Sequence, residues 1–325
     1  MRCTNKRSFL ISILLCTVFL LQGCGNSTVI MPFSTNHSVS GYNLKENVSE
    51  ERADAFSSSL CVGESNVNAD ALSLNAGAAA LFDLNRRQVL YAKNMHEQVY
   101  PASITKILTA LVALDQGSLD DTLVASTGVQ INESGAQLAG VKPGDTMTLD
   151  QALHLLLLYS ANDVANLIAE HYGMTLNGFS EMMNEKASSL GCFKSNFSNS
   201  NGLSDETHYV TTYDLYLIMN AAMQYEAFTE IISMPAYETV YYDKNGEPKN
   251  ISVNTTNLFL RSDGYSAPEG VTVIGGKTGT TNAAGHCLIL LVRDTSGNPY
   301  ISIVMKSESR DTCYDDMLQL LGLIP

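Results

Sequence analysis

Tyr100-Pro101-Ala102-Ser103-Ile104-Thr105-Lys106-Ile107-Leu108-Thr109 is the stretch around which the rest of the sequence is best interpreted. It places a serine and a lysine three residues apart, after a proline and ahead of an apolar run. Positions i and i+3 share a helix face, so the ammonium of Lys106 would lie one turn from the hydroxyl of Ser103. Free backbone N–H groups and the positive end of the helix dipole lie beside the same serine. The stretch predicts a nucleophile with a place for an oxyanion, although Ser-x-x-Lys also occurs by chance in many helices.

The first 23 residues resemble an export signal rather than part of a fold. Arg2, Lys6 and Arg7 form a basic start, and an apolar run from Phe9 to Leu21 follows. This run is too short for a membrane-spanning helix, which needs about 20 apolar residues. The pattern therefore predicts that the chain is exported.

The apolar run ends in Leu21-Gln22-Gly23-Cys24, which resembles the bacterial lipobox, where the cysteine becomes the lipidated N-terminus. Gln22 departs from the small or β-branched residue that is usual there. A diacylglyceryl group on Cys24 would supply two acyl chains, enough for stable anchoring. We expect a protein held by this lipid on the outer face of a bacterial cytoplasmic membrane. A plain secretory signal, with Cys24 incidental, is the alternative.

The sequence is acidic, with a formal net charge of −14 over 325 residues. Removing the leader, which has three basic and no acidic residues, takes this charge to −17. Such a surface has no electrostatic reason to bind the phosphate backbone of nucleic acids, and no basic run suggests otherwise. We expect no nucleic-acid partner.

The cysteines argue against a metal site. Four of the seven lie beyond residue 24, at Cys61, Cys192, Cys287 and Cys313, without a Cys-x-x-Cys pair or a histidine at ligand spacing. They could pair in three ways, and the sequence does not choose among them. Because a domain of this size does not need disulfides to form a core, we expect mostly buried thiols, and no metal or other cofactor.

The chain divides by composition into three parts. After the leader, residues 24–73 are rich in Ser, Asn and Glu without sustained periodicity, which predicts a flexible tether. Residues 74–325 would form one folded domain, with a helix-rich part over about residues 118–234. Its expected helices are the one that begins near Ser103 and those over Ala152–Leu158, Val164–Tyr172, Phe179–Leu190, Thr212–Met223 and Asp315–Leu321.

Strand-like runs lie at both ends of this domain and enclose the helices. They cover Gly77–Leu84, Gln88–Ala92, Tyr237–Tyr242, Val271–Ile274, His286–Val292 and Tyr300–Met305. The order predicts an α+β fold in which one antiparallel sheet, built from both ends of the domain, is flanked by helices.

Two further motifs are candidate partners of Ser103. The first is Ser160-Ala161-Asn162, a polar break between two apolar helices that could also be a simple connector. The second is Lys277-Thr278-Gly279, which follows two glycines and precedes Thr280. In this segment the glycines would let another chain approach a strand edge, and Lys277 would place a cation beside it.

Taken in order, the three motifs resemble the signature of the penicillin-recognising serine enzymes. The two serines are 57 residues apart, and Lys277 follows Ser160 by 117 residues. Within that group the sequence is similar to the D-alanyl-D-alanine carboxypeptidases, low-molecular-mass penicillin-binding proteins of peptidase family S11. The similarity extends from Ala78 to Leu321 and implies a β-lactamase/transpeptidase-like α+β fold.

Five additional blocks carry the resemblance: Val89–Asn94, Asn199–Leu203, His208–Leu215, Asn254–Leu258 and Ala284–His286. The blocks Asn199–Leu203 and His208–Leu215 separate this family from its relatives. One departure from the family pattern is Ala161, where glycine is common.

The resemblance implies an acyl-enzyme mechanism. Ser103 would attack the carbonyl between the two terminal D-alanines of a peptidoglycan stem peptide, with Lys106 as the base. A serine hydroxyl needs such a base, and burial together with the second cation, Lys277, would depress the pKa of Lys106. Ser160 would relay a proton towards the leaving D-alanine, and Asn162 would hold Lys106 and the substrate amide.

The resemblance also implies the substrate-binding residues. Lys277 and Thr278 would bind the terminal carboxylate, and the strand that carries them with Gly279 would pair with the substrate backbone. The N–H groups of Ser103 and Thr280 would form the oxyanion hole. Arg310 lies about where the family can carry a carboxylate-assisting arginine, and an ordinary surface arginine is the alternative. β-Lactam antibiotics are expected as covalent inhibitors.

Three other functions share these motifs. A D,D-endopeptidase or transpeptidase would use the same acyl-enzyme with another scissile amide or acceptor. A β-lactamase would need a glutamate-activated water, but no Glu-x-x-Leu-Asn sequence lies between Asn162 and Lys277. A catalytically silent β-lactam-binding sensor is disfavoured because all motif residues are intact.

Overall fold

The computed structural model describes residues 59–325. The expected leader, the proposed lipid site Cys24 and most of the expected tether lie outside the described residues. Within residues 59–325, no helix combines the length and the apolar character that crossing a membrane requires.

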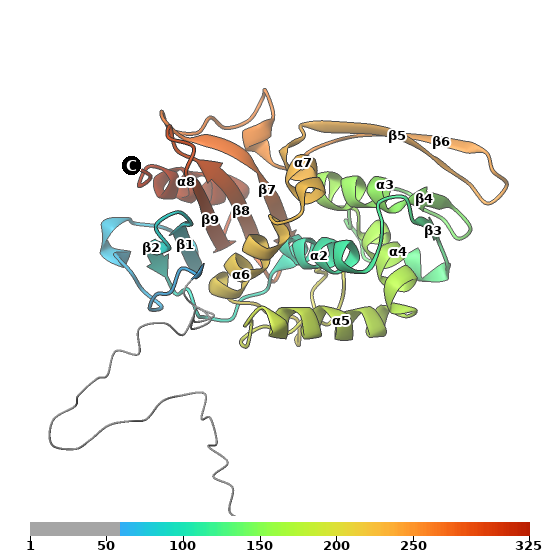
Figure 1. Ribbon diagram of the computed structural model, residues 1–325, viewed down its shortest axis with the longest axis horizontal. Coiled ribbons are helices and arrows are strands. Elements are labelled where there is room, and N and C mark those ends of the chain that lie inside the picture. The colour runs from blue at the N-terminus through green and yellow to red at the C-terminus, as the bar shows by residue number, and fades with distance from the viewer. Residues whose placement is uncertain (1–58) are drawn as a thin grey trace, which may run out of the picture. The chain divides into compact units, whose positions relative to one another are not determined.

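The central element is an antiparallel five-stranded sheet built from both ends of the domain, as expected (Figure 1). Its strand order is β2-β1-β9-β8-β7. The strands are β1 (Ala78–Asp83), β2 (Gln88–Lys93), β7 (Thr272–Thr281), β8 (Gly285–Arg293) and β9 (Pro299–Ser307). β7 extends well beyond the expected Val271–Ile274, so the whole Lys277-Thr278-Gly279 motif lies within an edge strand.

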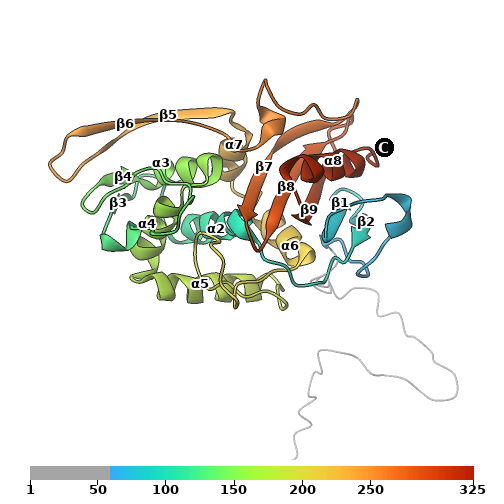
Figure 2. The same cartoon turned by 180° about the vertical axis from the view of Figure 1, so that it is seen from behind.

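Both faces of this sheet are covered, which explains why its strands are nearly continuous apolar runs. Along β1, Ala78, Ala80 and Phe82 join one hydrophobic cluster, whereas Ala79 and Leu81 join another. The first cluster contains α2 (Lys106–Gln116) and α6 (Thr212–Ala222), and the second contains α8 (Arg310–Leu321). Figure 2 shows α8 in front of the sheet, with α6 behind it.

A second sheet of four strands corrects the expectation of a single sheet. Its order is β3-β4-β5-β6. The strands are β3 (Thr122–Val124), β4 (Thr146–Thr148), β5 (Ala236–Tyr242) and β6 (Pro248–Asn254). We expected Tyr237–Tyr242 in the main sheet, but β5 instead pairs with β6 in a hairpin.

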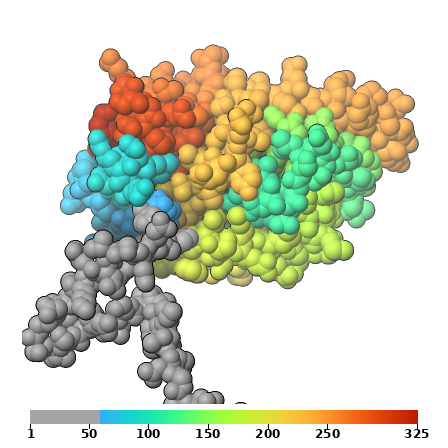
Figure 3. All heavy atoms as spheres, in the orientation of Figure 1, coloured from blue at the N-terminus to red at the C-terminus, as the bar shows by residue number. Residues whose placement is uncertain are grey.

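The reason lies in the burial of this hairpin. Exposed and partly buried positions alternate along most of β5 and β6, and Figure 3 shows their atoms along one margin of the surface. The sequence pattern of a strand with one solvent-exposed face reveals the strand, but it does not determine which strand it pairs with.

The expected helices appear in order with shifted ends, and one further helix, α7, was not expected. The remaining ones are α3 (Leu149–His154), α4 (Asn162–Gly173), α5 (Leu176–Ser189) and α7 (Glu226–Ser233). The expected helix over Ala152–Leu158 is instead α3 followed by a π-helical turn, Leu155–Tyr159. α3 is capped by Thr148, whose hydroxyl accepts the Gln151 N–H, and α8 begins at Arg310 because the Ser309 hydroxyl accepts the Thr312 N–H.

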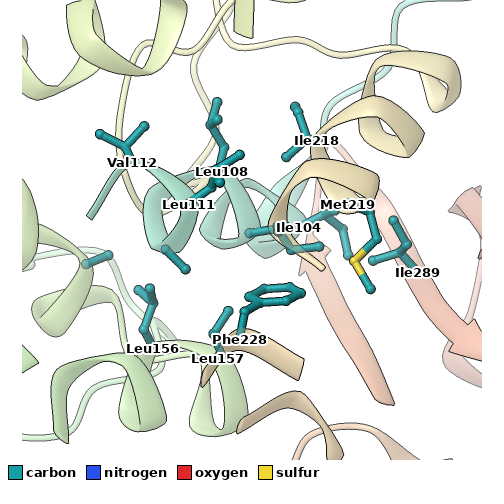
Figure 4. Close-up of a cluster of buried hydrophobic side chains, with 14 of the residues drawn as sticks. Ile104, Leu108, Leu111, Val112, Leu156, Leu157, Ile218, Met219, Phe228 and Ile289 are labelled. Atoms are coloured by element: carbon teal, nitrogen blue, oxygen red, sulfur yellow. The ribbon is translucent and has the colours of Figure 1, made fainter. Parts of the chain in front are cut away.

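α2 is buried at the centre of the first cluster. Figure 4 shows Leu108, Leu111 and Val112 of α2 among side chains from the π-helical turn, α6 and α7. Burying one such side chain contributes about 1.5–3 kcal/mol. This packing fixes the N-terminal end of α2, where Ser103 and Lys106 lie.

The folded domain begins before residue 74, which corrects the expected end of the tether. Cys61 is buried, and its backbone N–H donates to the Tyr216 hydroxyl of α6 over 2.9 Å. Val67 forms a bridge with Ala92 of β2. These few contacts lie in a polar stretch without hydrophobic periodicity, so the sequence pattern does not reveal them. All four described cysteines, Cys61 included, are buried thiols, as expected.

Candidate active site

Ser103 lies in a strained turn that precedes α2. The turn is a 3₁₀-helix, Ala102–Thr105, so Ser103 is outside the α-helix in which we expected it. Ala102 has φ +48°, a conformation that non-glycine residues adopt rarely. Its carbonyl packs against Gly202, where an added Cβ would overlap the carbonyl oxygen, and Gly202 itself has φ +84°. Only glycine fits this position without displacing the Ser103 turn.

A buried histidine holds the other side of the turn. His208 Nδ1 accepts the Ser198 N–H at 3.1 Å, and Nε2 lies 2.8 Å from the Thr105 hydroxyl. Burial lowers the pKa of His208 to about 4, so the ring is neutral near neutral pH. Because Nδ1 accepts a hydrogen bond, the ring proton is on Nε2, and this N–H donates a hydrogen bond to the Thr105 hydroxyl oxygen. The histidine of the family block therefore stabilises the turn beneath Ser103.

Lys106 is surrounded by three oxygen atoms. Its Nζ lies 2.9 Å from Ser103 Oγ, 2.8 Å from Asn162 Oδ1 and 2.5 Å from the Asn201 carbonyl oxygen. The last two oxygens can only accept hydrogen bonds, provided that Asn162 Nδ2 donates to the Gln137 carbonyl as it does here. A neutral lysine has two N–H groups and one lone pair, so its lone pair would face the Ser103 hydroxyl.

Burial favours this neutral form. Lys106 is 0% exposed, and its pKa lies well below the usual value. Desolvation is the largest cause, the charge of Lys277 adds to it, and the charge of Asp163 opposes both. Burial and the charge of Lys277, the two causes expected from the sequence, are thus the two that lower the pKa of Lys106.

A second serine–lysine pair stands beside the first. Lys277 Nζ donates to Ser160 Oγ at 2.9 Å and to the Thr278 carbonyl oxygen at 2.9 Å. Ser160 follows the π-helical turn and has φ +68°, which is unusual for a serine. Lys277 is 1% exposed, and burial lowers its pKa to about 7. Three separate segments, the Ser103 turn with α2, the turn at Ser160 and strand β7, therefore bring two lysines and two serines together.

The edge of β7 runs past the Ser103 turn. A Cβ at position 279 would lie 3.0 Å from the backbone nitrogen of Ser103, so Gly279 permits the close approach. The Thr278 hydroxyl donates to the Thr256 hydroxyl at 2.6 Å, and the Thr280 hydroxyl lies 3.2 Å from His286 Nδ1. This approach brings the expected oxyanion-hole segment next to Ser103.

These groups line a cavity of about 590 Å³. Ser103, Ser160, Asn162, Thr278 and Thr280 all contribute to its surface.

The start of α8 closes the cavity near β7. Arg310 lines it, with a side chain that is 66% exposed and 3.6 Å from Asp311. The neighbouring Cys287 and Cys313 also line the cavity, and burial raises the pKa of each thiol to about 12, so neither is a thiolate near neutral pH. Among the described residues that line the cavity, Arg310 is the one arginine or lysine.

The opposite wall is a segment tied down by α4. The Asn162 N–H donates to the Gln137 carbonyl at 2.8 Å, in addition to the bond from Nδ2. The buried Asp163 carboxylate accepts the N–H groups of residues 139, 140 and 141 at 2.8–3.0 Å. The first two residues of α4 thus fix the wall that carries residues 133–137.

Sequence reasoning missed this use of Asp163, the Asn201 carbonyl and Thr256. The Asp163 carboxylate directly follows a motif residue, but a helix-start aspartate is also an ordinary feature, so no signal marks its long-range contacts. Asn201 acts through its backbone, which any residue would supply. Within residues 59–325, no group of three or more metal-ligating side chains is close enough to hold an ion.

The fold and the two serine–lysine pairs match the class of the penicillin-recognising serine enzymes. The D-alanyl-D-alanine carboxypeptidase family S11 matches residues 65–309. The chain is 34% identical to the D-alanyl-D-alanine carboxypeptidase DacF of Bacillus subtilis over 67% of its length. It is 31% identical to a D-alanyl-D-alanine endopeptidase of Escherichia coli over 75% of its length and 76% of that protein.

A solved structure agrees with these similarities. The Streptomyces K15 DD-transpeptidase superposes with a TM-score of 0.71 at 26% identity, over 78% of this chain and 97% of that one. The chain therefore belongs to peptidase family S11. It spans only 54% of the length of the Bacillus protein.

We predict that Asp163→Asn loosens the wall of the cavity. The substitution replaces one of the two carboxylate oxygens with an NH₂ group, so at least one of the three N–H donors loses its acceptor. A buried donor left unsatisfied costs about 1–3 kcal/mol. We expect the free energy of unfolding in urea to fall by about that amount, with slower acylation by a fluorescent penicillin. Asp120→Asn, at an exposed aspartate, is the control. Equal stability of the two variants would contradict the assignment.

Proposed function

We propose that this protein is a serine-type D-alanyl-D-alanine carboxypeptidase that removes the terminal D-alanine of peptidoglycan stem pentapeptides. The observation that carries the proposal is the 2.9 Å contact between Lys106 Nζ and Ser103 Oγ, with two acceptors on the other sides of Nζ. Membership of family S11 supports the same substrate class. β-Lactams would inhibit the enzyme by acylating Ser103.

In the acylation step, Lys106 accepts the proton of the Ser103 hydroxyl as Oγ bonds to the carbonyl carbon of the penultimate D-alanine. The Ser103 and Thr280 N–H groups donate to the resulting oxyanion, and one such donor is typically worth about 10²–10³ in rate. The C–N bond then breaks, and the proton that Lys106 took from Ser103 passes through Ser160 to the leaving amine, which leaves Lys106 neutral again. Lys277 holds the Ser160 hydroxyl for this relay at 2.9 Å.

In the second step, water attacks the acyl-enzyme and releases the shortened peptide. Lys106 accepts the proton of the water and returns it to Ser103 Oγ as the ester bond breaks.

Before acylation, the terminal carboxylate of the intact substrate is bound by Lys277, Thr278 and Arg310, and the edge of β7 pairs with the peptide backbone.

We also propose that the chain is exported and is anchored through a lipid on Cys24. The basic start, the short apolar run and the lipobox-like Leu21-Gln22-Gly23-Cys24 support this. The anchor would hold the domain at the outer face of the cytoplasmic membrane, where its substrate lies.

Ser103→Ala should abolish release of D-alanine from a pentapeptide, and Lys106→Met should slow it by about 10²–10⁴, as the loss of a general base does. D-Alanine is measured in a coupled assay, with Ser296→Ala, an exposed turn serine, as the control. Undiminished release by Ser103→Ala would refute the mechanism. A cross-linked peptide cleaved faster than the pentapeptide would favour the endopeptidase alternative.

The pH profile of kcat/KM should be a bell. Lys106 must be neutral to accept a proton, so activity falls at acid pH as its lowered pKa is passed. Lys277 must be charged to bind a carboxylate, so activity also falls above about pH 7, where it loses its proton. Lys277→Arg stays protonated and should lose the alkaline decline. A decline at the same pH in this variant would assign it to another group.

Lipidation is tested in cells by labelling with a radioactive fatty acid. Cys24→Ser should lose the label and move the protein from the membrane fraction to the soluble fraction. Cys16→Ser, in the apolar run of the leader, should keep both the label and the membrane location. Label retained by Cys24→Ser would exclude this cysteine as the lipid site.

A further inference from the structure

The cavity around Ser103 carries charged side chains of both signs on its surface. Among its lining residues Glu133 is the only acidic one and Arg310 the only arginine or lysine, within the part of the chain that the structure describes. The buried Lys277 adds a cation behind the cavity surface, where it donates to the lining Ser160. A ligand that matches this layout would carry a carboxylate near Arg310 and Lys277 and a cation near Glu133.

Glu133 and Arg310 belong to opposite walls. Gln137 is bonded to Asn162, the first residue of α4, whereas Arg310 is the first residue of α8. Figures 1 and 2 show α4 and α8 on opposite sides of β7. Glu133 is four residues from the fixed Gln137 carbonyl, which limits their separation to about 13–14 Å at full extension. Residues 133–137 all line the cavity, so Glu133 belongs to the same wall as Gln137.

The Glu133 carboxylate is free to meet a ligand. It is exposed at the cavity, and among the described residues no hydrogen bond or ion pair engages its side chain. Its backbone is fixed nevertheless, because its carbonyl accepts the Ala136 N–H and the wall beyond is tied to Asn162 and Asp163. A fixed backbone holds the charge at one place along the cavity.

We propose that Glu133 is a specificity-determining residue that selects substrates with a free side-chain ammonium on the residue preceding D-alanyl-D-alanine. This rests on the proposed function, which places the terminal carboxylate at Lys277 and Arg310. The rest of the peptide then extends past Ser103 and Asn162 towards residues 133–137. A diamino acid two residues before the C-terminus directs its amine to that wall, so the enzyme would favour stem peptides whose amine is not yet cross-linked.

The test compares Nα-acetyl-L-lysyl-D-alanyl-D-alanine with a free side-chain amine against the same peptide acetylated there. Wild type should show a kcat/KM ratio of about 2–5 in favour of the free amine, the range of a solvent-exposed ion pair. Glu133→Gln should bring the ratio to about one, and Glu133→Lys should bring it below one. Added salt should lower the wild-type ratio, since the Debye length is only about 10 Å at 0.1 M.

Glu269→Gln is the matched control, because it removes one negative charge at an exposed position outside the cavity lining. It should keep the wild-type ratio. A wild-type ratio of one, or an unchanged ratio in Glu133→Gln, overturns the proposal while leaving the carboxypeptidase function intact.

A second measurement separates the two proposals. Acylation of Ser103 is followed by mass spectrometry with a penicillin that bears a side-chain amine and with its acetylated form. If neither peptide releases D-alanine, the proposed function fails, but the ratio of the two acylation rates still tests Glu133. The proposal is supported if the wild-type enzyme reacts faster with the penicillin that bears the free amine and Glu133→Gln does not. It is overturned if the wild-type enzyme reacts with both penicillins at the same rate.

Discussion

The constraint on which the site depends is the burial of the Lys106 amine. An ammonium without water around it is strongly destabilised, so the fold favours the neutral amine, which a serine nucleophile needs as its base. Burial alone would not aim the lone pair. Asn162 Oδ1 and the Asn201 carbonyl take the two N–H groups and leave the third direction to Ser103. Both acceptors come from segments far from α2 in sequence, so the whole domain must fold before the base exists.

The same region holds backbone strain that the surrounding fold must stabilise. Ala102 and Ser160 both have positive φ, a conformation that costs on the order of 1–3 kcal/mol for each residue. Around Ala102, Gly202 provides space and the neutral His208 ring holds Thr105. Around Ser160, the Lys277 ammonium holds the hydroxyl. The packed core around α2 supplies the rigidity that keeps these turns from relaxing.

The sequence was sufficient for most strands of the main sheet, for the order of the expected helices and for four residues that meet around Ser103, namely Lys106, Ser160, Asn162 and Lys277. It was insufficient where partners are decided by packing. The β5 strand was recognisable, but its pairing with β6 in a second sheet depends on which face stays wet. The contacts of Cys61 with α6 stand in a stretch whose composition predicts disorder. The Asn201 carbonyl and the three N–H groups held by Asp163 act through the backbone or at long range, where residue type carries little information.

The two lysines differ in pKa for a reason that suits the proposed roles. Burial lowers both values, and the charge of Lys277 lowers the pKa of Lys106 further, so Lys277 is the more readily protonated of the two. A substrate carboxylate beside Lys277 would favour the charged form of this lysine still more. That charge in turn disfavours protonation of Lys106. In the proposed mechanism, binding of the correct C-terminus therefore strengthens the condition under which Lys106 can accept the Ser103 proton, and a peptide without that carboxylate loses both binding and part of the activation of the base.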